Sequence, residues 1–312
     1  MEKISFDGQA VVVTGAGSGL GRSYALEIAR RGGSVVVNDL GGSVRGEGAS
    51  SGLADAVVEE IRSAGGKAVA NYSDVASAEG GQQMIAAALD NFGRIDAVIA
   101  NAGNFRMAKF DALSASDLMA LLTVHAVGSW NVAQAAWPHM KAQGYGRLVF
   151  TASSVGLFGT QSLAAYGTAK GAIMGLMNNL SYEGAPHGIL CNAIMPNAFT
   201  RMTATVTSDD LGGNPYSAQI PETFAPEFAQ GLATFLASRD CATTHGLYSS
   251  LGGRIARVFV GVTKGHQGSR KEPLSAEDIA AHWQDIRDDS LGYAIPADVT
   301  DEFRYVIEGR CQ

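Results

Sequence analysis

Tyr166 and Lys170 are the residues of this sequence whose types and spacing point most directly to chemistry. They are four residues apart in a stretch with helical spacing, so their side chains are expected on one face of a helix. A tyrosine with its ordinary pKa of about 10 is a poor base at neutral pH, but a neighbouring ammonium favours the phenolate. Ser153 follows an expected strand, where its hydroxyl can bond a substrate oxygen. Each residue alone also fits a surface or turn position, but together they predict proton transfer with an alcohol or ketone.

A glycine-rich segment, TGAGSGLG at positions 14–21, lies between the first expected strand and the first expected helix. Glycines there let the backbone turn sharply and approach a pyrophosphate, and free N–H groups at the helix start attract its negative charge. Alone, the segment also fits a turn that binds nothing. In this context it predicts dinucleotide binding by Gly15, Ser18, Gly19, Leu20 and Gly21.

Asp39 ends the second expected strand, where a carboxylate can accept hydrogen bonds from both adenosine ribose hydroxyls. It favours NAD over NADP unless Arg22 or Arg45 compensates for its charge, although a turn or cap role also fits. Lys170 is suited to bind the nicotinamide ribose beside Tyr166. Further cofactor contacts are expected at the carboxyl ends of later strands, from Asp74, Val75, Asn101, Ala102 and Gly103.

Short apolar runs alternate with amphipathic stretches along most of the chain, which predicts a parallel sheet covered by helices. The expected strands are residues 10–14, 34–38, 67–71, 96–100, 147–151 and 189–194. The expected helices are residues 20–30, 53–64, 78–91, 116–141, 166–183 and 225–237. Residues 41–52 hold five glycines and three serines, more than a tight connection needs, and are expected to form a flexible loop.

The alternation stops after Gly253, and one more helix is expected at residues 275–285 with Ser275 as its N-cap. We therefore expect an α/β fold: a doubly wound, Rossmann-type parallel sheet of about seven strands in a single domain. The dehydrogenase domain is expected over residues 1–264, with a helical extension, residues 265–312, packed on the same domain.

The composition limits the possible partners. With 46% hydrophobic and 17% charged residues, the chain is typical of a compact domain, and its net charge of −7 argues against binding nucleic acid or an anionic membrane. The three cysteines are too scattered for a disulfide framework or a metal site. No apolar stretch has membrane-spanning length and no signal peptide fits before residue 10, so we expect a cytoplasmic protein.

These motifs together resemble the short-chain dehydrogenase/reductase family, from about residue 6 to residue 253. The resemblance is carried by residues 14–21, by NAG at 101–103, by Ser153 and by YGTAK at 166–170. It implies a nicotinamide-dependent oxidoreductase, assembled as a homodimer or homotetramer through the helices at 116–141 and 166–183. A non-catalytic NAD(H)-binding protein is the alternative, and the intact serine, tyrosine and lysine argue against it.

Within that family the chain is similar to the (3R)-hydroxyacyl-CoA dehydrogenase units of peroxisomal multifunctional enzymes, through residues 37–42, 65–72, 196–198, 201–203 and 273–287. In that subgroup the unit is joined to a hydratase and a lipid-carrier domain, so a free-standing relative is expected here. The implied reaction is the oxidation of a (3R)-hydroxyacyl-CoA to the 3-oxoacyl-CoA with NAD, and a steroid-like alcohol is the alternative. Specificity is expected in residues 198–222.

The resemblance also marks two departures. Many family members hold a relay water with an asparagine, and the matching residue here is His125, as in the subgroup. His125 is therefore a candidate catalytic residue that could hold that water, bond the backbone, or be a buried structural imidazole. Pro196 and Asn197 stand where most members have Pro-Gly, and the resemblance implies that they bind the nicotinamide side.

Overall fold

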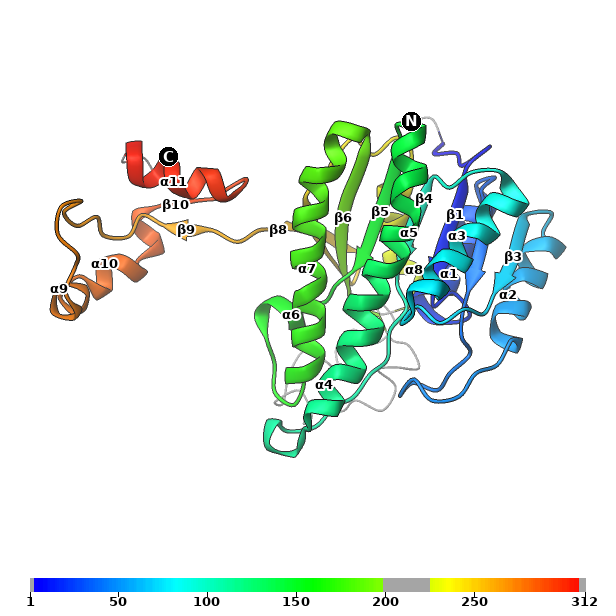
Figure 1. Ribbon diagram of the computed structural model, residues 1–312, viewed down its shortest axis with the longest axis horizontal. Helices are drawn as coiled ribbons and strands as arrows, with labels where there is room; N and C mark the ends of the chain where they lie inside the picture. Colours follow the sequence, from blue (N-terminus) through cyan, green and yellow to red (C-terminus); the bar gives the residue numbers. More distant parts are fainter. Residues whose placement is uncertain (1–2, 199–224, 309–312) are drawn as a thin grey trace. The chain divides into compact units, whose positions relative to one another are not determined.

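The computed structural model describes residues 3–198 and 225–308, and Figure 1 shows their arrangement. Contacts divide the chain into two compact units, Met1–Arg257, here called the sheet unit, and Val258–Gln312, here called the tail unit. The division lies close to the predicted boundary at residue 264. That the tail packs on the sheet unit stays a prediction.

The sheet unit is built on one eight-stranded sheet with the strand order β3-β2-β1-β4-β5-β6-β7-β8. The strands are β1 (Ala10–Thr14), β2 (Ser34–Asn38), β3 (Lys67–Asn71), β4 (Ala97–Ala100), β5 (Gly146–Thr151), β6 (Ile189–Pro196), β7 (Gly246–Leu251) and β8 (Arg254–Val258). From β1 to β7 all neighbouring strands of this sheet pair in parallel. The predicted doubly wound sheet is confirmed.

Helices cover both faces of this sheet (Figure 1). One face carries α3 (Ala78–Phe92), α4 (Ala115–Leu122), α5 (Gly128–Gln143) and α7 (Ala164–Gly184). The other carries α1 (Gly19–Arg30), α2 (Gly52–Ser63) and α8 (Glu227–Ala237). Because both faces are covered, the central strands read as continuous apolar runs, and every residue of β1 and β5 is buried.

The site is positioned by the neighbouring strands β1 and β4, which pair in parallel with Val13 opposite Ile99. From β1 the chain winds outward through β2 to β3, and then returns to β4 on the other side of β1. This reversal is the topological switch point at which open α/β sheets bind ligands, beyond the carboxyl ends of the strands. The loops after β1 and β4 meet there.

The sheet has one strand more than the predicted seven, because β8 follows β7. Only Gly252 and Gly253 separate the two strands, and a connection that short joins antiparallel neighbours. Both glycines have positive φ angles, 56° and 81°, which two-residue hairpin turns favour. β8 is largely exposed, and its apolar and polar residues alternate only weakly, so the apolar pattern used for the other strands did not reveal it.

The long helix predicted at residues 116–141 is divided into three pieces. Ser114 begins α4 with a capping box closed by Asp117. A π-helical turn, η2 (Thr123–Val127), then separates α4 from α5. Apolar spacing cannot reveal such a turn, because its neighbours are helical on both sides. Single π turns are frequent at functional sites, and His125 lies in the middle of this one.

The tail unit contains short elements with little interior. They are β9 (Val262–Thr263), α9 (Ala276–Ala281), α10 (Trp283–Arg287), η6 (Asp289–Leu291), β10 (Tyr293–Ala294) and α11 (Val299–Glu308). Ser275 caps α9 as predicted, in a capping box with Asp278. The single helix expected at residues 275–285 is interrupted at His282.

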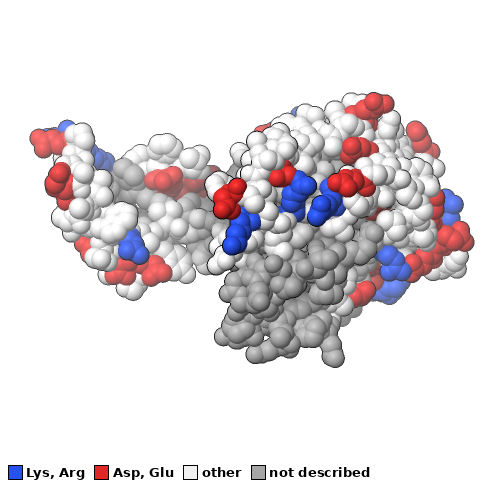
Figure 2. Space-filling view, turned by 90° about the horizontal axis from the view of Figure 1, so that it is seen from below, with Lys and Arg blue, Asp and Glu red and all other residues white. Residues whose placement is uncertain are grey.

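The charged surface in Figure 2 mixes Lys and Arg with Asp and Glu over the described part of the sheet unit. This distribution agrees with the net charge of −7 and with ion pairs such as that between Arg22 and Glu60. Within the described ranges, no helix is both long and apolar enough to span a bilayer.

Candidate active site

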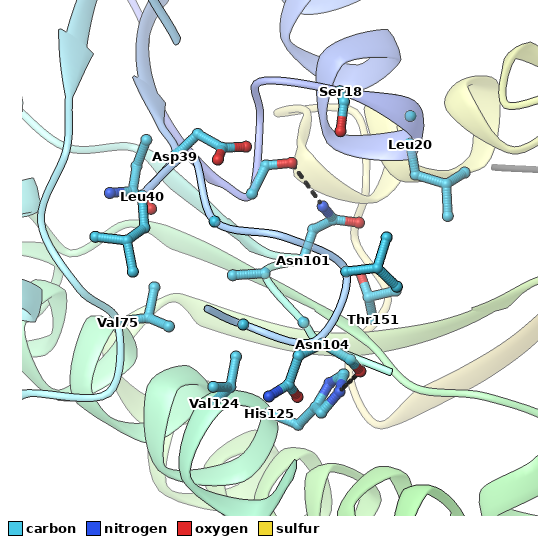
Figure 3. A pocket seen from close by; sticks show the side chains of 18 of the residues that line it. Ser18, Leu20, Asp39, Leu40, Val75, Asn101, Asn104, Val124, His125 and Thr151 are labelled. Carbon is cyan, nitrogen blue, oxygen red and sulfur yellow. Dashed lines mark hydrogen bonds between the residues drawn. The ribbon is translucent and has the colours of Figure 1, made fainter. Parts of the chain in front are cut away.

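A cavity of about 290 Å³ opens where the loops after β1 and β4 meet. Figure 3 shows Ser18 and Asp39 on one side of it and Asn104 and His125 on the other. Its walls come from the ends of β1 to β6, from η2 and from α7, which are elements far apart in the sequence. The fold therefore brings the glycine segment and the Tyr-Lys pair to one cavity, as the sequence predicted.

The glycine segment shapes the end of the cavity next to α1. Gly15 and Gly19 have φ angles of 64° and 55°, a conformation that other residues seldom adopt. A Cβ atom on Gly21 would lie 2.2 Å from the Gly15 carbonyl oxygen, so this crossing of the backbone needs glycine. Ser18 precedes α1 without capping it through its side chain. The first N–H groups of α1 thus meet the cavity, as a pyrophosphate site requires.

Asn101, at the end of β4, braces the glycine segment from the neighbouring strand. Its side-chain amide donates to the carbonyl oxygens of Thr14 and Gly15, over 3.1 and 3.3 Å. In return, the Thr14 hydroxyl accepts from the backbone N–H groups of Asn101 and Ala102, over 2.9 and 3.0 Å. Four hydrogen bonds therefore lock the loops on either side of the switch point together.

Asp39 is held at the end of β2 by two backbone donors. Its Oδ2 accepts from the Gly17 N–H over 2.8 Å, and its Oδ1 accepts from the Gly41 N–H over 2.7 Å. A Cβ on Gly17 would lie 2.7 Å from Oδ2, so the close approach depends on that glycine. The carboxylate is fixed in direction and still has lone pairs for further donors.

Tyr166 and Lys170 lie near the start of α7, and Ser153 follows β5, so the sheet and one helix bring the three together. The Ser153 oxygen accepts from the Val155 N–H over 3.2 Å, and the Ser153 side chain acts on Tyr166 as a hydrogen-bonding neighbour that lowers the pKa of the phenol. The Lys170 Nζ donates to the Thr151 carbonyl oxygen over 2.7 Å and lies 5.7 Å from the centre of the Tyr166 ring. The predicted constellation is thus assembled.

Burial shifts both titratable groups toward their neutral forms. It raises the pKa of Tyr166 to about 12, against an opposing hydrogen bond from Ser153. It also lowers the pKa of Lys170 to about 7. Tyr166 therefore keeps its proton at neutral pH, while Lys170 is close to its midpoint. Added positive charge beside Tyr166 would lower its pKa again.

His125 is fully enclosed, with 1% of its surface exposed. Its Nε2 is 2.8 Å from the carbonyl oxygen of Asn104, which can only accept, so Nε2 carries the proton. Burial holds the pKa of His125 well below its usual range, so the ring is neutral. Of the alternatives left open by the sequence, the bond to the backbone and the burial of the ring are both observed.

Most of the predicted cofactor and catalytic residues line the cavity. They are Gly15, Ser18, Gly19, Leu20, Asp39, Asp74, Val75, Asn101, Ala102, Gly103, His125, Tyr166, Lys170 and Pro196. Gly21 packs behind Gly15, and Ser153 lies beside Tyr166. Asn197 is exposed, and its N–H donates to the Ser250 carbonyl oxygen over 2.9 Å.

Sequence reasoning missed a group of cavity residues. The main ones are Leu40, Gly42, Ser43, Val44, Gly46, Asn104, Val124 and Thr151. The first five lie in or beside the glycine-rich loop, whose unusual length was the available signal. Asn104 and Val124 carried no signal, because a loop residue and a helix residue become neighbours only through the π turn.

The comparisons agree with this geometry. The family model for short chain dehydrogenase matches residues 9–211, so the chain belongs to the short-chain dehydrogenase family. These matches confirm the predicted family and the predicted fold. They also confirm the predicted class of activity, a nicotinamide-dependent oxidoreductase acting on a CH–OH group.

Particular relatives narrow the class. A short-chain type dehydrogenase/reductase of Mycobacterium tuberculosis is 43% identical over 90% of this chain and 94% of its own length. Mouse peroxisomal multifunctional enzyme type 2 is 44% identical over 91% of this chain, which spans 37% of that enzyme. Full-length peroxisomal multifunctional enzyme type 2 of Drosophila melanogaster matches with a TM-score of 0.79 and 30% identity, over 98% of this chain and 50% of that one.

Proposed function

We propose that the protein is an NAD-dependent dehydrogenase that interconverts a secondary alcohol and a ketone, with a (3R)-hydroxyacyl-CoA as substrate. The observation that carries the proposal is the meeting of Ser153, Tyr166 and Lys170 at the cavity shaped by the glycine segment. Burial disfavours the charged forms of both Tyr166 and Lys170, so burying the two side by side is unfavourable. A non-catalytic NAD(H)-binding protein would have no need for this arrangement.

In the proposed mechanism, the substrate oxygen sits between the hydroxyls of Ser153 and Tyr166. Ser153 donates a hydrogen bond to it, since its own oxygen is already oriented by the Val155 N–H. In oxidation Tyr166 takes the alcohol proton, and in reduction it returns that proton. A bound nicotinamide would accept or supply the hydride.

Lys170 is proposed to have two tasks. Its ammonium stabilises the Tyr166 phenolate, and its remaining donors can bind the nicotinamide ribose while one is held by Thr151. Because Tyr166 must lose its proton before it accepts one, oxidation is expected to accelerate as the pH rises from 5 to 7, the range in which Lys170, with a pKa of about 7, still carries its charge. A rate of oxidation that falls over this range would contradict the role of Tyr166.

The preference for NAD is proposed from Asp39. Two backbone donors hold its carboxylate at the cavity wall, so it cannot swing away from a 2′-phosphate. Arg22 is paired with Glu60 over 2.6 Å, which reduces its ability to neutralise that phosphate. Values of kcat/KM measured with NAD and with NADP test this preference, and equal values would contradict it.

The substrate class rests on resemblance, since both the relatives and the subgroup motifs point to hydroxyacyl-CoA dehydrogenase units. Local charge adds no support, because Arg106 is paired with Asp117, which reduces its ability to bind a phosphate. The specificity segment predicted at residues 198–222 lies outside the described residues from 199 onward. A hydroxysteroid therefore remains the second candidate.

The test compares kcat/KM for a (3R)-hydroxyacyl-CoA, its pantetheine-truncated analogue and a 17β-hydroxysteroid. The proposal expects the acyl-CoA to be the best substrate and truncation to lower kcat/KM at least about tenfold, because phosphate contacts are lost. If truncation costs nothing, or the steroid is much the better substrate, the acyl-CoA assignment is wrong. No turnover of any secondary alcohol would favour the non-catalytic protein.

Assembly and location are proposed with the function. We expect a homodimer or homotetramer, and the exposed Met119 and Trp130 on α4 and α5 give apolar surface for it. Sedimentation of the intact chain tests this, and a monomer at micromolar concentration would contradict it. A cytoplasmic location is kept as a proposal, and because named relatives are peroxisomal enzymes, fractionation of the source cells is its test.

A further inference from the structure

The Tyr166 ring lies between two other rings that come from different parts of the fold. Phe105, in the loop after β4, meets it edge-on with the centroids 5.3 Å apart and the planes at 73°. His125, in the π turn, meets it edge-on at 5.5 Å and 88°. Edge-to-face contacts of this kind are favourable and directional, so the two rings restrict the tilt of the phenol.

Both neighbouring rings depend on one irregular stretch, residues 104–108, here called the brace. Four hydrogen bonds hold it. His125 donates to the Asn104 carbonyl oxygen over 2.8 Å, and the Asn104 side-chain amide donates to the Ala120 carbonyl oxygen over 3.3 Å. The Phe105 N–H donates to the Val44 carbonyl oxygen over 2.9 Å, and the Ala108 N–H donates to the Ser162 carbonyl oxygen over 3.0 Å. The brace has no strand or helix of its own over these residues. Its position is therefore set by these partners.

The partners of the brace lie on the elements that matter for the reaction. Val44 belongs to the glycine-rich loop and lines the cavity. Ser162 lies just before α7, four residues ahead of Tyr166, and its φ angle of 61° is left-handed. A non-glycine residue held in that conformation is constrained by its surroundings. The brace thus joins one wall of the cavity to the start of the helix that carries Tyr166.

His125 is locked more tightly than a relay group needs to be. Its Nε2 is committed to the Asn104 carbonyl, and Gly103 packs so close that an added Cβ would lie 2.3 Å from the ring carbon Cε1. The Ser129 hydroxyl donates to the His125 carbonyl oxygen over 2.6 Å, which fixes the backbone of the π turn. The ring can neither turn nor exchange partners without moving the brace.

We propose that Phe105 and His125 are positioning residues that act through the brace to hold the Tyr166 hydroxyl against Ser153. This inference rests on the proposed function, because it assigns what supports the tyrosine of that site. If the Tyr166 hydroxyl moves away from Ser153, it loses the hydrogen bond that lowers its pKa. Loosening the brace therefore leaves less of Tyr166 in the phenolate form at a given pH, while the glycine segment and Asp39 keep their own hydrogen bonds.

The first experiment replaces the ring of Phe105. Phe105→Leu is expected to lower kcat about tenfold, because a small misplacement of a reacting group is costly, with the dissociation constant for NADH within about twofold of the original. The acidic limb of the kcat–pH profile should move to higher pH. Phe105→Tyr keeps the edge-to-face ring and should restore most of kcat, whereas Phe235→Leu, the same change on the partly exposed outer side of α8, should change nothing.

The second experiment is a double-variant cycle with His125→Leu. If both residues act through one brace, the double variant Phe105→Leu with His125→Leu should have a kcat no more than about twofold below that of the worse single variant. If the losses in kcat of the two single variants multiply in the double variant, the two residues act independently, which would contradict the proposal. If His125→Leu abolishes turnover while Phe105→Leu keeps the original kcat and pH profile, His125 handles the proton itself and the positioning proposal is wrong.

A third readout needs no turnover, so it separates this inference from the proposed function. In protein carrying labelled tyrosine, the Tyr166 ring should give separate NMR signals for its two edges, because ring flips are slow between Phe105 and His125. Phe105→Leu should merge them into one averaged signal. If the signals are already averaged in the unchanged protein, Phe105 and His125 do not hold the Tyr166 ring, and the positioning proposal is wrong whatever substrate the enzyme takes.

Discussion

The sheet unit and the tail unit use apolar residues in opposite ways. In the sheet unit they fill the interior, so that Val11, Val13 and Tyr24 have no exposed surface. Among the described residues of the tail unit, only Ala294 is buried, while Val299, Phe303 and Ile307 of α11 are each more than 60% exposed. The first unit therefore carries its own stability, and the second needs another surface to cover it.

This difference explains where chemistry can be located. A reacting group must be held within a fraction of an ångström, which requires close packing on several sides. Lys170 and His125 are enclosed in the sheet unit, and each is fixed by a backbone carbonyl. The described tail has exposed side chains on short elements, so its contribution is expected to be in covering and assembly rather than in proton transfer.

The largest expected effect on stability is in the interior of the sheet unit. Ile28 of α1 is fully buried against the sheet, so Ile28→Ala should lower the free energy of unfolding by about 2–5 kcal/mol through lost burial and a cavity. Urea denaturation measures it. A loss below 1 kcal/mol would mean that the interior relaxes around the cavity and that the contrast between the units is overstated.

Lys170 is expected to cost the sheet unit stability at neutral pH. Its pKa is about 7 in the folded protein against about 10.4 in an unfolded chain, so the unfolded state binds more protons between these values. Stability from this group is therefore lowest at pH 7 and below, and rises with pH toward 10. Lys170→Met should stabilise by about 1–2 kcal/mol at pH 7, since lost desolvation outweighs the lost bond to Thr151.

The check on Lys170 is the pH dependence of that gain. Unfolding free energies of the two proteins, measured from pH 7 to pH 9, should converge as the pH rises. A gain that stays constant or widens would show that Lys170 is already charged at neutral pH in the folded state.

Asp39 should have a moderate effect that is confined to cofactor choice. Asp39→Ala should narrow the preference for NAD over NADP about tenfold, because it removes ribose acceptors and a repulsive charge. Asp39→Asn is the matched control, since it removes the charge and keeps one acceptor oxygen. The ratio of kcat/KM values for the two cofactors is the measurement, and an unchanged ratio would show that Asp39 only holds the Gly17 and Gly41 backbone.

The smallest effect is expected in the tail unit. Phe303→Ser changes a side chain that is 64% exposed, so the unfolding of the sheet unit should shift by less than about 0.5 kcal/mol. The same urea series as for Ile28→Ala reports it. A loss of 2 kcal/mol or more in the free energy of unfolding at low protein concentration would show that Phe303 is buried. That result would contradict the difference between the two units.

The sequence predicted the parts of the site that depend on local pattern. The first three strands have the predicted bounds, and the Tyr-Lys pair, the glycine segment and Asp39 meet as expected, because parallel strands bring their carboxyl ends to one edge. The brace was not predictable, since it depends on hydrogen bonds between residues about 20 to 60 positions apart. The π turn and β8 were missed because neither has a distinct apolar period.

The central claim is that Tyr166 transfers the proton in a nicotinamide-dependent reaction of a secondary alcohol. The most direct test measures kcat and NADH binding in Tyr166→Phe, which removes one oxygen and leaves the ring between its neighbours. The account predicts that kcat falls by about 10³-fold or more while the dissociation constant for NADH stays within about twofold. A variant that keeps more than a tenth of the original kcat would contradict it.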